Sequence, residues 1–230
     1  MIKRTEMQKI VKNYSDIRIG VLGSHSALEV MDGAKDENLN TVVFCQKGRE
    51  TPYQRFGRIA DEIMILKSFK DISSASNQKK LRDTSTIIIP HRSLTAYLGY
   101  NILENKLKIP IFGNRALFQA EERYNKKNQY YLLKKAGIKY PKIFKNPKLI
   151  NKPAIVKVQE KNRKLERAFF TVSSYSDFKK KSEEKIKNGM ISRKDLNESS
   201  IEELAIGTYL NFNYFYTPIS ENVDFIGIER

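Results

Sequence analysis

The amino-acid sequence predicts an α/β protein whose N-terminal part is a doubly wound parallel sheet. Short β-branched apolar runs recur through residues 17–115, and segments with apolar residues three and four positions apart separate them. Gly, Pro, Asn or Asp flanks each run. Such runs are typical of strands buried on both faces of a parallel sheet, and their alternation with helices is the pattern of an α/β domain.

The elements of this first part follow in chain order. Five strands are expected, with the sequences IRIGVLG, TVVFCQ, EIMILK, STIIIP and IPIFG, at residues 17–23, 41–46, 62–67, 85–90 and 109–113. Helices are expected between them, for example over residues 27–37 (ALEVMDGAKDE) and 94–106 (LTAYLGYNILENK), because their apolar residues recur at helical spacing.

From about residue 116 the pattern changes to a mixed α+β arrangement. Residues 115–141 are expected to be helical up to Gly137 and Pro141, because both residue types stop helices. The remaining expected elements are strands at 152–159 and 167–174, a helix at 174–189 capped by Ser173, Ser174 or Ser176, and a hairpin of residues 208–218 and 223–229 turned at 220–222.

Composition places the chain among cytoplasmic globular proteins. Hydrophobic residues make up 40% of its 230 residues, and no apolar run approaches the roughly 18 residues of a membrane span. The N-terminus alternates charged and apolar residues, unlike a signal peptide. A single cysteine, Cys45, excludes an internal disulfide framework and a cysteine-cluster zinc site.

The net charge of +16 has two interpretations. One is a lysine-rich surface without a specific role. The other is attraction to phosphate groups, on nucleotides or on nucleic acid. The lysines are scattered and acidic residues interrupt most of their clusters, so small phosphorylated ligands fit the pattern better than a nucleic-acid groove.

Four polar clusters follow the expected strands, namely GSHS, QKGRE, HRS and GNR. Ligands of open parallel sheets bind beyond the carboxyl ends of the strands. The candidate ligand contacts there are Ser24, His25, Ser26, His91, Arg92 and Ser93, and further positive charge comes from Lys47, Arg49 and Arg115.

These clusters predict a pocket for a phosphorylated small molecule. Gly23 frees the backbone for a sharp turn, and the following helix start favours an anion. The alternative is that the serines are ordinary helix caps and that the two histidines, the only ones in the chain, are structural. No P-loop, dinucleotide-binding loop or Cys/His metal set is present, so P-loop phosphoryl transfer and hydride transfer are not indicated.

The second part resembles the ATP-grasp superfamily. A Lys before a helix that ends in Ala-Gly-Ile, then a proline and a strand ending in Lys, matches the family's two lysines that reach the phosphates of ATP. By this resemblance Lys126 and Lys157 bind the nucleotide. The segment IEELAIG matches the hinge that holds adenine and ribose, with Glu202 or Glu203 as its carboxylate.

A closer resemblance covers nearly the whole chain. The segments GVLGSHSALEVMDGAKDE, CQKGRETPYQRF, TIIIPHRSLTAYLGYNILEN, NQYYLLKKAGIKYP and NFNYFYTPI are similar to those of the archaeal formate-dependent AICAR ligases, the PurP type. The resemblance implies synthesis of formyl-AICAR in purine biosynthesis from AICAR, formate and ATP with Mg²⁺, through formyl phosphate. It also implies that His25 and Ser93 contact AICAR.

The same resemblance implies a division into three parts. Residues 1–115 would be a Rossmann-like pre-ATP-grasp domain that binds substrate, residues 116–205 the ATP-grasp small lobe, and residues 206–230 the first hairpin of the large lobe. Family members continue beyond this hairpin, so the metal ligands are expected beyond Arg230. A chain of this length is then expected not to complete ligation alone: a longer parent protein or a partner chain would supply the missing lobe, and a homo-oligomer stays an alternative.

One loop departs from the family pattern. Between the two strands of the small lobe, where relatives have a Gly-rich loop over the triphosphate, this chain has no glycine from Gln159 to Phe170. Arg163 and Arg167, with Lys161 and Lys164, would supply point charges in place of backbone N–H groups. A paralogue with a different substrate therefore stays an open interpretation.

The sequence is thus compatible with three functions. The first is an ATP-dependent ligase of purine biosynthesis, without an assigned catalytic residue. The second is a module that binds AICAR or a nucleotide without turnover. The third, nucleic-acid binding, depends on net charge alone and ranks last.

Overall fold

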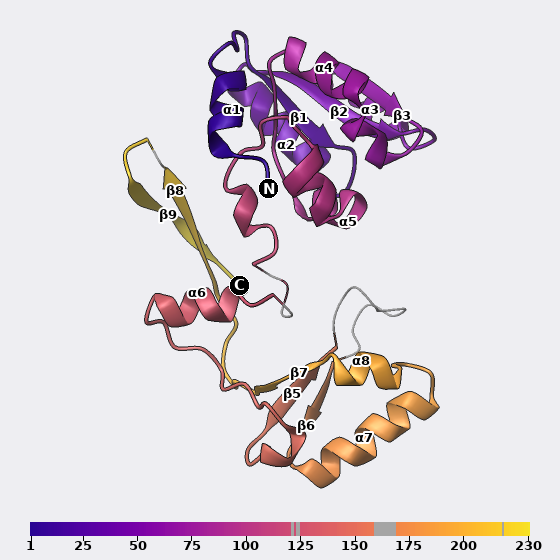
Figure 1. Cartoon of the computed structure of the whole chain (residues 1–230), viewed down its shortest axis with the longest axis vertical. Coiled ribbons are helices and arrows are strands. Elements are labelled where there is room, and N and C mark those ends of the chain that lie inside the picture. The colour runs from indigo at the N-terminus through magenta and orange to yellow at the C-terminus, as the bar shows by residue number, and fades with distance from the viewer. Residues whose placement is uncertain (121, 123–124, 159–168, 218) are drawn as a thin grey trace. The chain divides into compact units, whose positions relative to one another are not determined.

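The computed structural model describes residues 1–230 apart from 121, 123–124, 159–168 and 218, and it divides into two compact units (Figure 1). Unit 1 is Met1–Asn128 and unit 2 is Gln129–Arg230. The finer division at residues 115/116 and 205/206 stays a prediction.

Unit 1 is built on a parallel sheet with the strand order β3-β2-β1-β4. The strands are β1 (Arg18–Leu22), β2 (Asn40–Gln46), β3 (Glu62–Leu66) and β4 (Thr86–Ile88). Its helices are α1 (Arg4–Val11), α2 (Ala27–Asp36), α3 (Thr51–Arg55), α4 (Ala75–Asp83) and α5 (Arg92–Leu98), with short 3₁₀ or π turns at Phe69–Ser73, Ile102–Lys106 and Arg115–Leu117.

The sheet is covered on both faces, which confirms the doubly wound prediction. Successive side chains of a strand point to opposite faces. In β2, Val42 and Phe44 pack in one apolar cluster with residues of α4 and α5, whereas Val43 and Cys45 pack in a second cluster with residues of α2 and α3. Burial on both faces is the reason that these strands are continuous apolar runs.

Two predicted elements of unit 1 are wrong in extent. Residues 109–113 form only an isolated parallel bridge, between Ile111 and Ile88, instead of a fifth strand. Pro110 has no N–H group to donate to a ladder, which limits the pairing. The helix expected over 94–106 breaks at Gly99, whose φ of +74° is outside the helical region.

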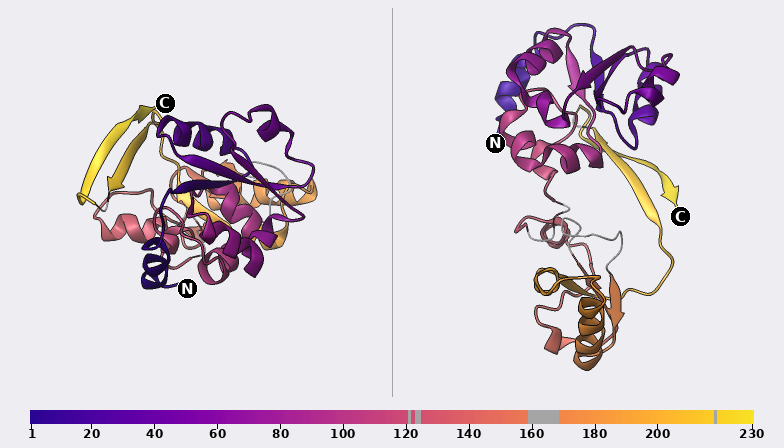
Figure 2. Two further views of the ribbon diagram at one scale, coloured as in Figure 1. Left: turned by 90° about the horizontal axis from the view of Figure 1, so that it is seen from above. Right: turned by 90° about the vertical axis from the view of Figure 1, so that its right-hand side faces the viewer.

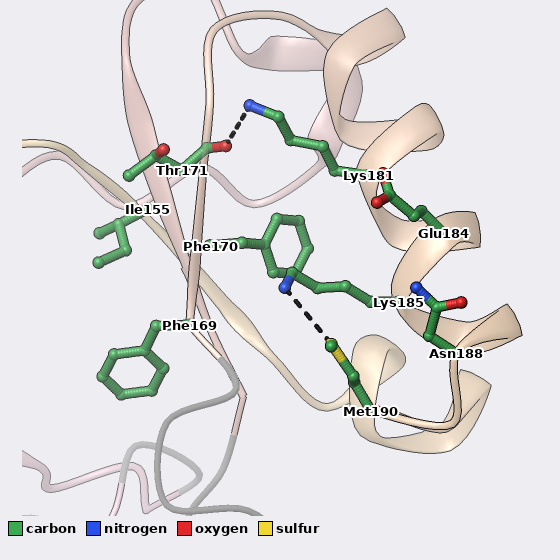
Figure 3. A pocket seen from close by; sticks show the side chains of 9 residues that line it. All are labelled: Ile155, Phe169, Phe170, Thr171, Lys181, Glu184, Lys185, Asn188 and Met190. Carbon is green, nitrogen blue, oxygen red and sulfur yellow. Dashed lines mark hydrogen bonds between the residues drawn. The ribbon is translucent and has the colours of Figure 1, made fainter.

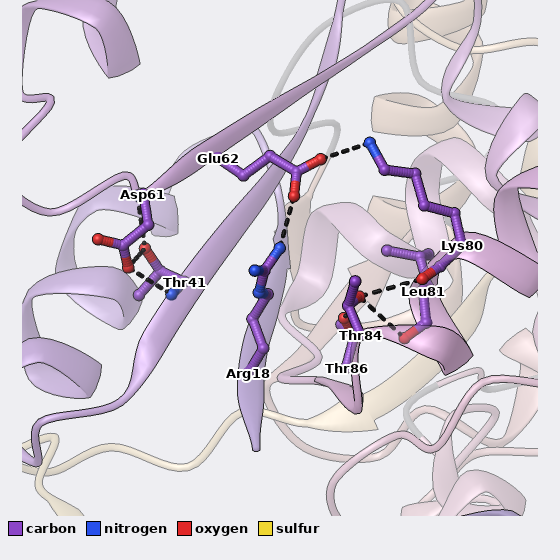
Figure 4. A network of polar contacts seen from close by, with 8 residues as sticks. All are labelled: Arg18, Thr41, Asp61, Glu62, Lys80, Leu81, Thr84 and Thr86. Carbon is purple, nitrogen blue, oxygen red and sulfur yellow. Dashed lines mark hydrogen bonds and ion pairs between the residues drawn. The ribbon is translucent and has the colours of Figure 1, made fainter. Parts of the chain in front are cut away.

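Ion pairs join the strands at the amino edge of the sheet (Figure 4). Glu62 at the start of β3 accepts from Arg18 of β1 and from Lys80 of α4, each at 2.5 Å. Burial raises the pKa of Glu62, but these two cations outweigh it, and the pKa lies below its usual value. In the same region Thr41 donates its hydroxyl to the Ile59 carbonyl at 2.7 Å, and its N–H to Asp61 at 2.7 Å.

Unit 2 contains a small antiparallel sheet with the order β6-β5-β7. Its elements are α6 (Gln129–Lys135), a 3₁₀ turn (Pro147–Leu149), β5 (Ala154–Lys157), β6 (Phe170–Val172), α7 (Tyr175–Lys187), α8 (Arg193–Asn197) and β7 (Ser200–Glu203). One face of the sheet forms an apolar core with α7, in which Val156, Phe170 and Phe178 are buried. The opposite face of β5 and β7 carries polar side chains.

Of two expectations about helices near and in unit 2, the cap of α7 agrees with the structure and the length of the preceding helix does not. Among the three serines proposed to cap α7, Ser174 does so, because its hydroxyl accepts from the N–H of Asp177. The helix expected over 115–141 is much shorter: only Gln129–Lys135 is α-helical in the described residues, preceded by turns at residues 126–127.

The last element is a hairpin with one apolar and one polar face. β8 (Asn211–Thr217) pairs with β9 (Asn222–Glu229), and Figure 2 shows them as a long two-stranded ribbon. The cross-strand pairs Phe212–Ile228, Tyr214–Phe225 and Tyr216–Val223 share one face, and all six side chains are 53% to 62% exposed. The residue Ile226 is the extra residue of a bulge, and the chain turns between Thr217 and Asn222, close to the predicted position.

None of the helices in the described part of the chain has the length and apolar character needed to cross a bilayer.

A pair of glycine substitutions tests the packing of the sheet. A Cβ at Gly20 of β1 would lie 2.7 Å from Phe44 and 2.7 Å from Thr86, so Gly20→Ala should destabilise the protein by about 2 kcal/mol through overpacking. A Cβ at Gly33 of α2 meets nothing within 4 Å, so Gly33→Ala should stabilise it by roughly 0.5–1 kcal/mol. The midpoint of urea unfolding, followed by circular dichroism, measures both. Equal midpoints for the two variants would contradict the packing around Gly20.

Candidate functional site

The carboxyl edge of the parallel sheet contains a topological switch point between β1 and β4. The chain runs from β1 outward to β2 and β3, and then returns to place β4 on the other side of β1. Connections on the two sides leave a crevice at such a point, where ligands of open α/β sheets bind. Ser24, after β1, and Ser93, in the first turn of α5 after β4, meet there, with the Ser24 hydroxyl donating to Ser93 Oγ at 2.9 Å.

His91 has a structural role at this edge. Its Nδ1 accepts from the N–H of Ser93 at 3.3 Å, so the ring caps α5. Because an N–H can only donate, the proton of the neutral ring lies on Nε2, which donates to the Leu22 carbonyl at 2.9 Å. Both ring nitrogens thus join β4 and α5 to β1, and a ligand contact by His91 would require one of these bonds to break.

His25 differs from His91 because it is exposed. It lies between β1 and α2, and its Nδ1 is 3.0 Å from the Ser26 hydroxyl. Arg92, the first residue of α5, is also exposed. The sequence-predicted substrate contacts Ser24, His25, Ser26, Arg92 and Ser93 all belong to the turns after β1 and β4, and their role as ligand contacts stays a prediction.

Arg115 does not supply charge to this edge as expected from the sequence. Its guanidinium is half-buried and donates to two backbone carbonyls, those of Leu103 and Ile109. Burial lowers the pKa of Arg115. The side chain therefore satisfies carbonyl groups at the end of the Ile102–Lys106 turn, a role that the strand-end pattern could not reveal.

The polar face of the sheet in unit 2 is centred on a buried ion pair. Glu202 of β7 lies opposite Ile155 of β5, so Lys157, two residues further along β5, points to the same face. The Lys157 ammonium is 2.5 Å from Glu202 Oε2, and Glu202 is only 1% exposed. Ser200 donates its hydroxyl to the other carboxylate oxygen at 2.9 Å.

Glu202 stays ionised despite its burial. Burial raises its pKa, but hydrogen bonds from Lys157, Tyr130 and Ser200 outweigh that effect, and the pKa lies below its usual value. Tyr130 comes from α6 and packs with its ring 5.6 Å from that of Tyr140. Sequence reasoning missed Tyr130, since an aromatic residue on a lysine-rich helix carries no signal of a polar contact.

The other sequence-predicted nucleotide contacts are Glu203, Lys126, Arg163 and Arg167. Glu203 points away from Glu202, is partly exposed, and pairs with Lys152 at 2.7 Å. Of the two glutamates proposed from the hinge segment, only Glu202 therefore contacts Lys157. Lys126 lies in a turn of unit 1, before α6. Arg163 and Arg167 fall outside the described residues.

A pocket of about 470 Å³ flanks the edge strand β6 (Figure 3). It lies beside β6 and α7, and Figure 3 shows Phe170 pointing toward the helix, with Phe169 on the other side of the strand. Lys181 donates to the Thr171 carbonyl at 2.9 Å, and Lys185 lies over the Phe170 ring. Both lysines are thus engaged with the protein, and Lys181 blocks the open edge of β6 in the way lysines protect edge strands.

Comparison with solved structures defines the class of fold. The crystal structure of an IMP biosynthesis protein PurP from Thermococcus kodakaraensis matches with a TM-score of 0.62 and 22% identity, covering 91% of this chain and 58% of that one. N5-carboxyaminoimidazole synthetase from Staphylococcus aureus matches with a TM-score of 0.56 and 15% identity, covering 92% of this chain and 53% of that one. The fold is that of the ATP-grasp enzymes.

Sequence comparison defines the family. The profile described as Protein of unknown function (DUF1246) matches residues 19–144, and that described as Domain of unknown function (DUF1297) matches residues 177–230. Curated relatives from Methanopyrus kandleri and Methanocaldococcus jannaschii, both named 5-formaminoimidazole-4-carboxamide-1-(beta)-D-ribofuranosyl 5'-monophosphate synthetase, are 38% and 35% identical over 232 residues.

The chain belongs to the family described as Protein of unknown function (DUF1246), and over its whole length it is similar to relatives of the PurP type, as its motifs predicted. It is matched over 100% of its own length, and it spans 63% of the length of each of these two relatives.

The ion pair of unit 2 makes the stability depend on pH. Because the pKa of Glu202 is lower in the folded than in the unfolded chain, its contribution is present above the unfolded pKa, about 4.3, and is lost as the pH falls through the folded value. Glu202→Gln should cost about 3 kcal/mol at pH 7, since it leaves the Lys157 charge without its partner.

Urea unfolding at pH 7 and at pH 3.5 checks this expectation. The difference between wild type and Glu202→Gln should shrink at the lower pH. Glu203→Gln is the matched control, because its side chain is 32% exposed, against 1% for Glu202, and its pair with Lys152 should contribute little. An equal loss in the free energy of unfolding for the two substitutions at pH 7 would contradict the larger contribution of the Glu202–Lys157 pair.

Proposed function

We propose that this protein is an ATP-dependent carbon–nitrogen ligase of purine biosynthesis that acts in the cytoplasm and forms formyl-AICAR from AICAR, formate and ATP. The observation that carries the proposal is the similarity along the whole chain to relatives that are named as such synthetases. The arrangement of polar side chains in both units supports it.

Unit 1 would hold AICAR. The hydroxyls of Ser24 and Ser93 converge at the switch point between β1 and β4, and each can exchange its mutual hydrogen bond for one to a ligand. His25, which is exposed beside them in the chain, would donate or accept through its ring. His91 would act through Ser93, as the cap that orients the start of α5.

Unit 2 would hold the nucleotide. The polar face of β5 and β7 offers an ammonium group, Lys157, for phosphate, and a carboxylate, Glu202, that keeps this cation in place before the nucleotide binds. ATP would supply the phosphoryl group that turns formate into formyl phosphate, with release of ADP. The AICAR amine would then attack the formyl carbon, and phosphate would leave. Lys126, with Arg163 and Arg167, would add positive charge near the phosphates.

The magnesium ion that the family implies does not fit the described residues. They contain no group of three His, Cys, Asp or Glu side chains that could hold a metal ion. No step is therefore assigned to residues around such an ion. We also propose that a second copy or a partner chain supplies further residues of the site.

Calorimetric titration with AICAR and with ATP separates the two units. Ser93→Ala should weaken AICAR binding by roughly tenfold, the cost of one hydrogen bond to a polar ligand, and should leave ATP binding unchanged. Lys157→Met should weaken ATP binding and leave AICAR binding unchanged. Ser76→Ala, in the exposed first turn of α4, is a control for Ser93→Ala.

The reaction itself is measured by chromatography of formyl-AICAR. Product formed from AICAR, formate and ATP supports the ligase. Binding of AICAR with no product from any acyl donor supports a binding module instead. Absence of AICAR and ATP binding in the folded chain would refute both.

A further inference from the structure

Arg49 is held in an unusual setting at the carboxyl edge of the parallel sheet. It follows β2, and its guanidinium carbon lies 5.6 Å from the centroid of the Tyr97 ring and 5.8 Å from that of Phe69. Its Nη1 also donates to the Tyr97 hydroxyl at 3.2 Å. The two rings are themselves 4.7 Å apart and tilted by 43°, so together they form an aromatic platform beside the guanidinium.

This platform is connected to the serine pair at the switch point. Tyr97 lies four residues after Ser93 on α5, which places both on one face of the helix. Ser93 in turn contacts Ser24. The turns that follow β1, β2 and β4 therefore converge through side chains at one edge.

The charge of Arg49 is not neutralised by a carboxylate. At the amino edge of the same sheet, Arg18 and Lys80 each form an ion pair, with Glu62. Among the ion pairs of the described residues, none includes Arg49, which is exposed. Its hydrogen bond to Tyr97 occupies only one of the five N–H donors of a guanidinium.

A positioned guanidinium without a counter-ion has the chemistry of a phosphate-binding group. Its planar fork of donors matches two oxygens of a phosphate, and stacking on aromatic rings lowers the entropy lost on binding. The cation–π contacts give the charge of Arg49 a structural use, and the N–H donors that do not bond to Tyr97 can in addition bind a phosphate.

We propose that Arg49 binds the 5'-phosphate of the ribonucleotide whose polar groups contact Ser24 and Ser93, and that Phe69 and Tyr97 hold it in position for this. The inference rests on the proposed function for the identity of the nucleotide, and it adds a specificity: the site distinguishes a ribonucleoside 5'-monophosphate from the corresponding ribonucleoside.

Titration of the full chain with AICAR and with AICA riboside, which lacks only the phosphate, tests this specificity. Arg49→Met should weaken AICAR binding by about 10- to 100-fold, the value of a charge-assisted contact. It should leave riboside binding within about twofold of wild type. Inorganic phosphate should compete with AICAR in wild type and no longer in the variant. Arg49→Lys should restore part of the loss, because it retains a charge without the fork.

Two control variants show whether the loss of AICAR affinity is specific to the charge and position of Arg49. Arg4→Met removes the same charge from the exposed start of α1 and should change neither affinity by more than about twofold, because exposed charges are screened by salt. Tyr97→Phe retains the ring and loses the hydroxyl, and it should cost less than Arg49→Met. Circular dichroism shows whether each variant is folded.

Several outcomes would overturn the proposal. Unchanged AICAR affinity in Arg49→Met would refute a phosphate contact while the proposed function stands. An equal loss for AICAR and the riboside in Arg49→Met and in Arg49→Lys would show a structural role alone. A folded wild-type chain that binds neither compound would refute the AICAR function and this inference with it.

Discussion

The pairing of β1 with β2 on one side and β4 on the other is the constraint on which the candidate substrate site depends. Gly20, in the middle of β1, leaves room for Phe44 from one neighbour and Thr86 from the other, so the three strands can lie in register. Because parallel strands end at the same edge, this register brings the turns after them together. The contact between Ser24 and Ser93 is a direct result.

The two edges of that sheet have different electrostatics, and the difference supports the proposed binding site. At the amino edge, cations and carboxylates neutralise one another and join the strands. At the carboxyl edge, hydroxyl groups, an exposed imidazole and the guanidinium of Arg49 remain. Charges paired within the protein stabilise it, whereas hydrogen bonds among polar side chains, as at the carboxyl edge, can be exchanged for bonds to a ligand.

The sheet of unit 2 differs from that of unit 1, because one of its faces is apolar and the other is polar. The core side is packed by α7, and the other side holds Glu202 and Lys157 together. A buried carboxylate is costly unless its oxygens are satisfied, and here an ammonium, a phenol and a hydroxyl do so. The result is a cation held at a defined place on the face proposed to meet the nucleotide.

The sequence by itself determined the fold class, the strands of the parallel sheet and the family, because buried runs, strand-end turns and contiguous motifs are local in the chain. It also pointed to Lys157 and Glu202 as members of one site. It did not separate Glu202 from Glu203, nor show that His91 caps α5 and that Arg115 turns to backbone carbonyls. Only the tertiary structure decided these points, along with the aromatic platform of Arg49, because each depends on which group a side chain contacts in the folded chain: distant side chains for Glu202 and Arg49, and backbone groups for His91 and Arg115. Partners of that kind leave no periodic pattern along the chain.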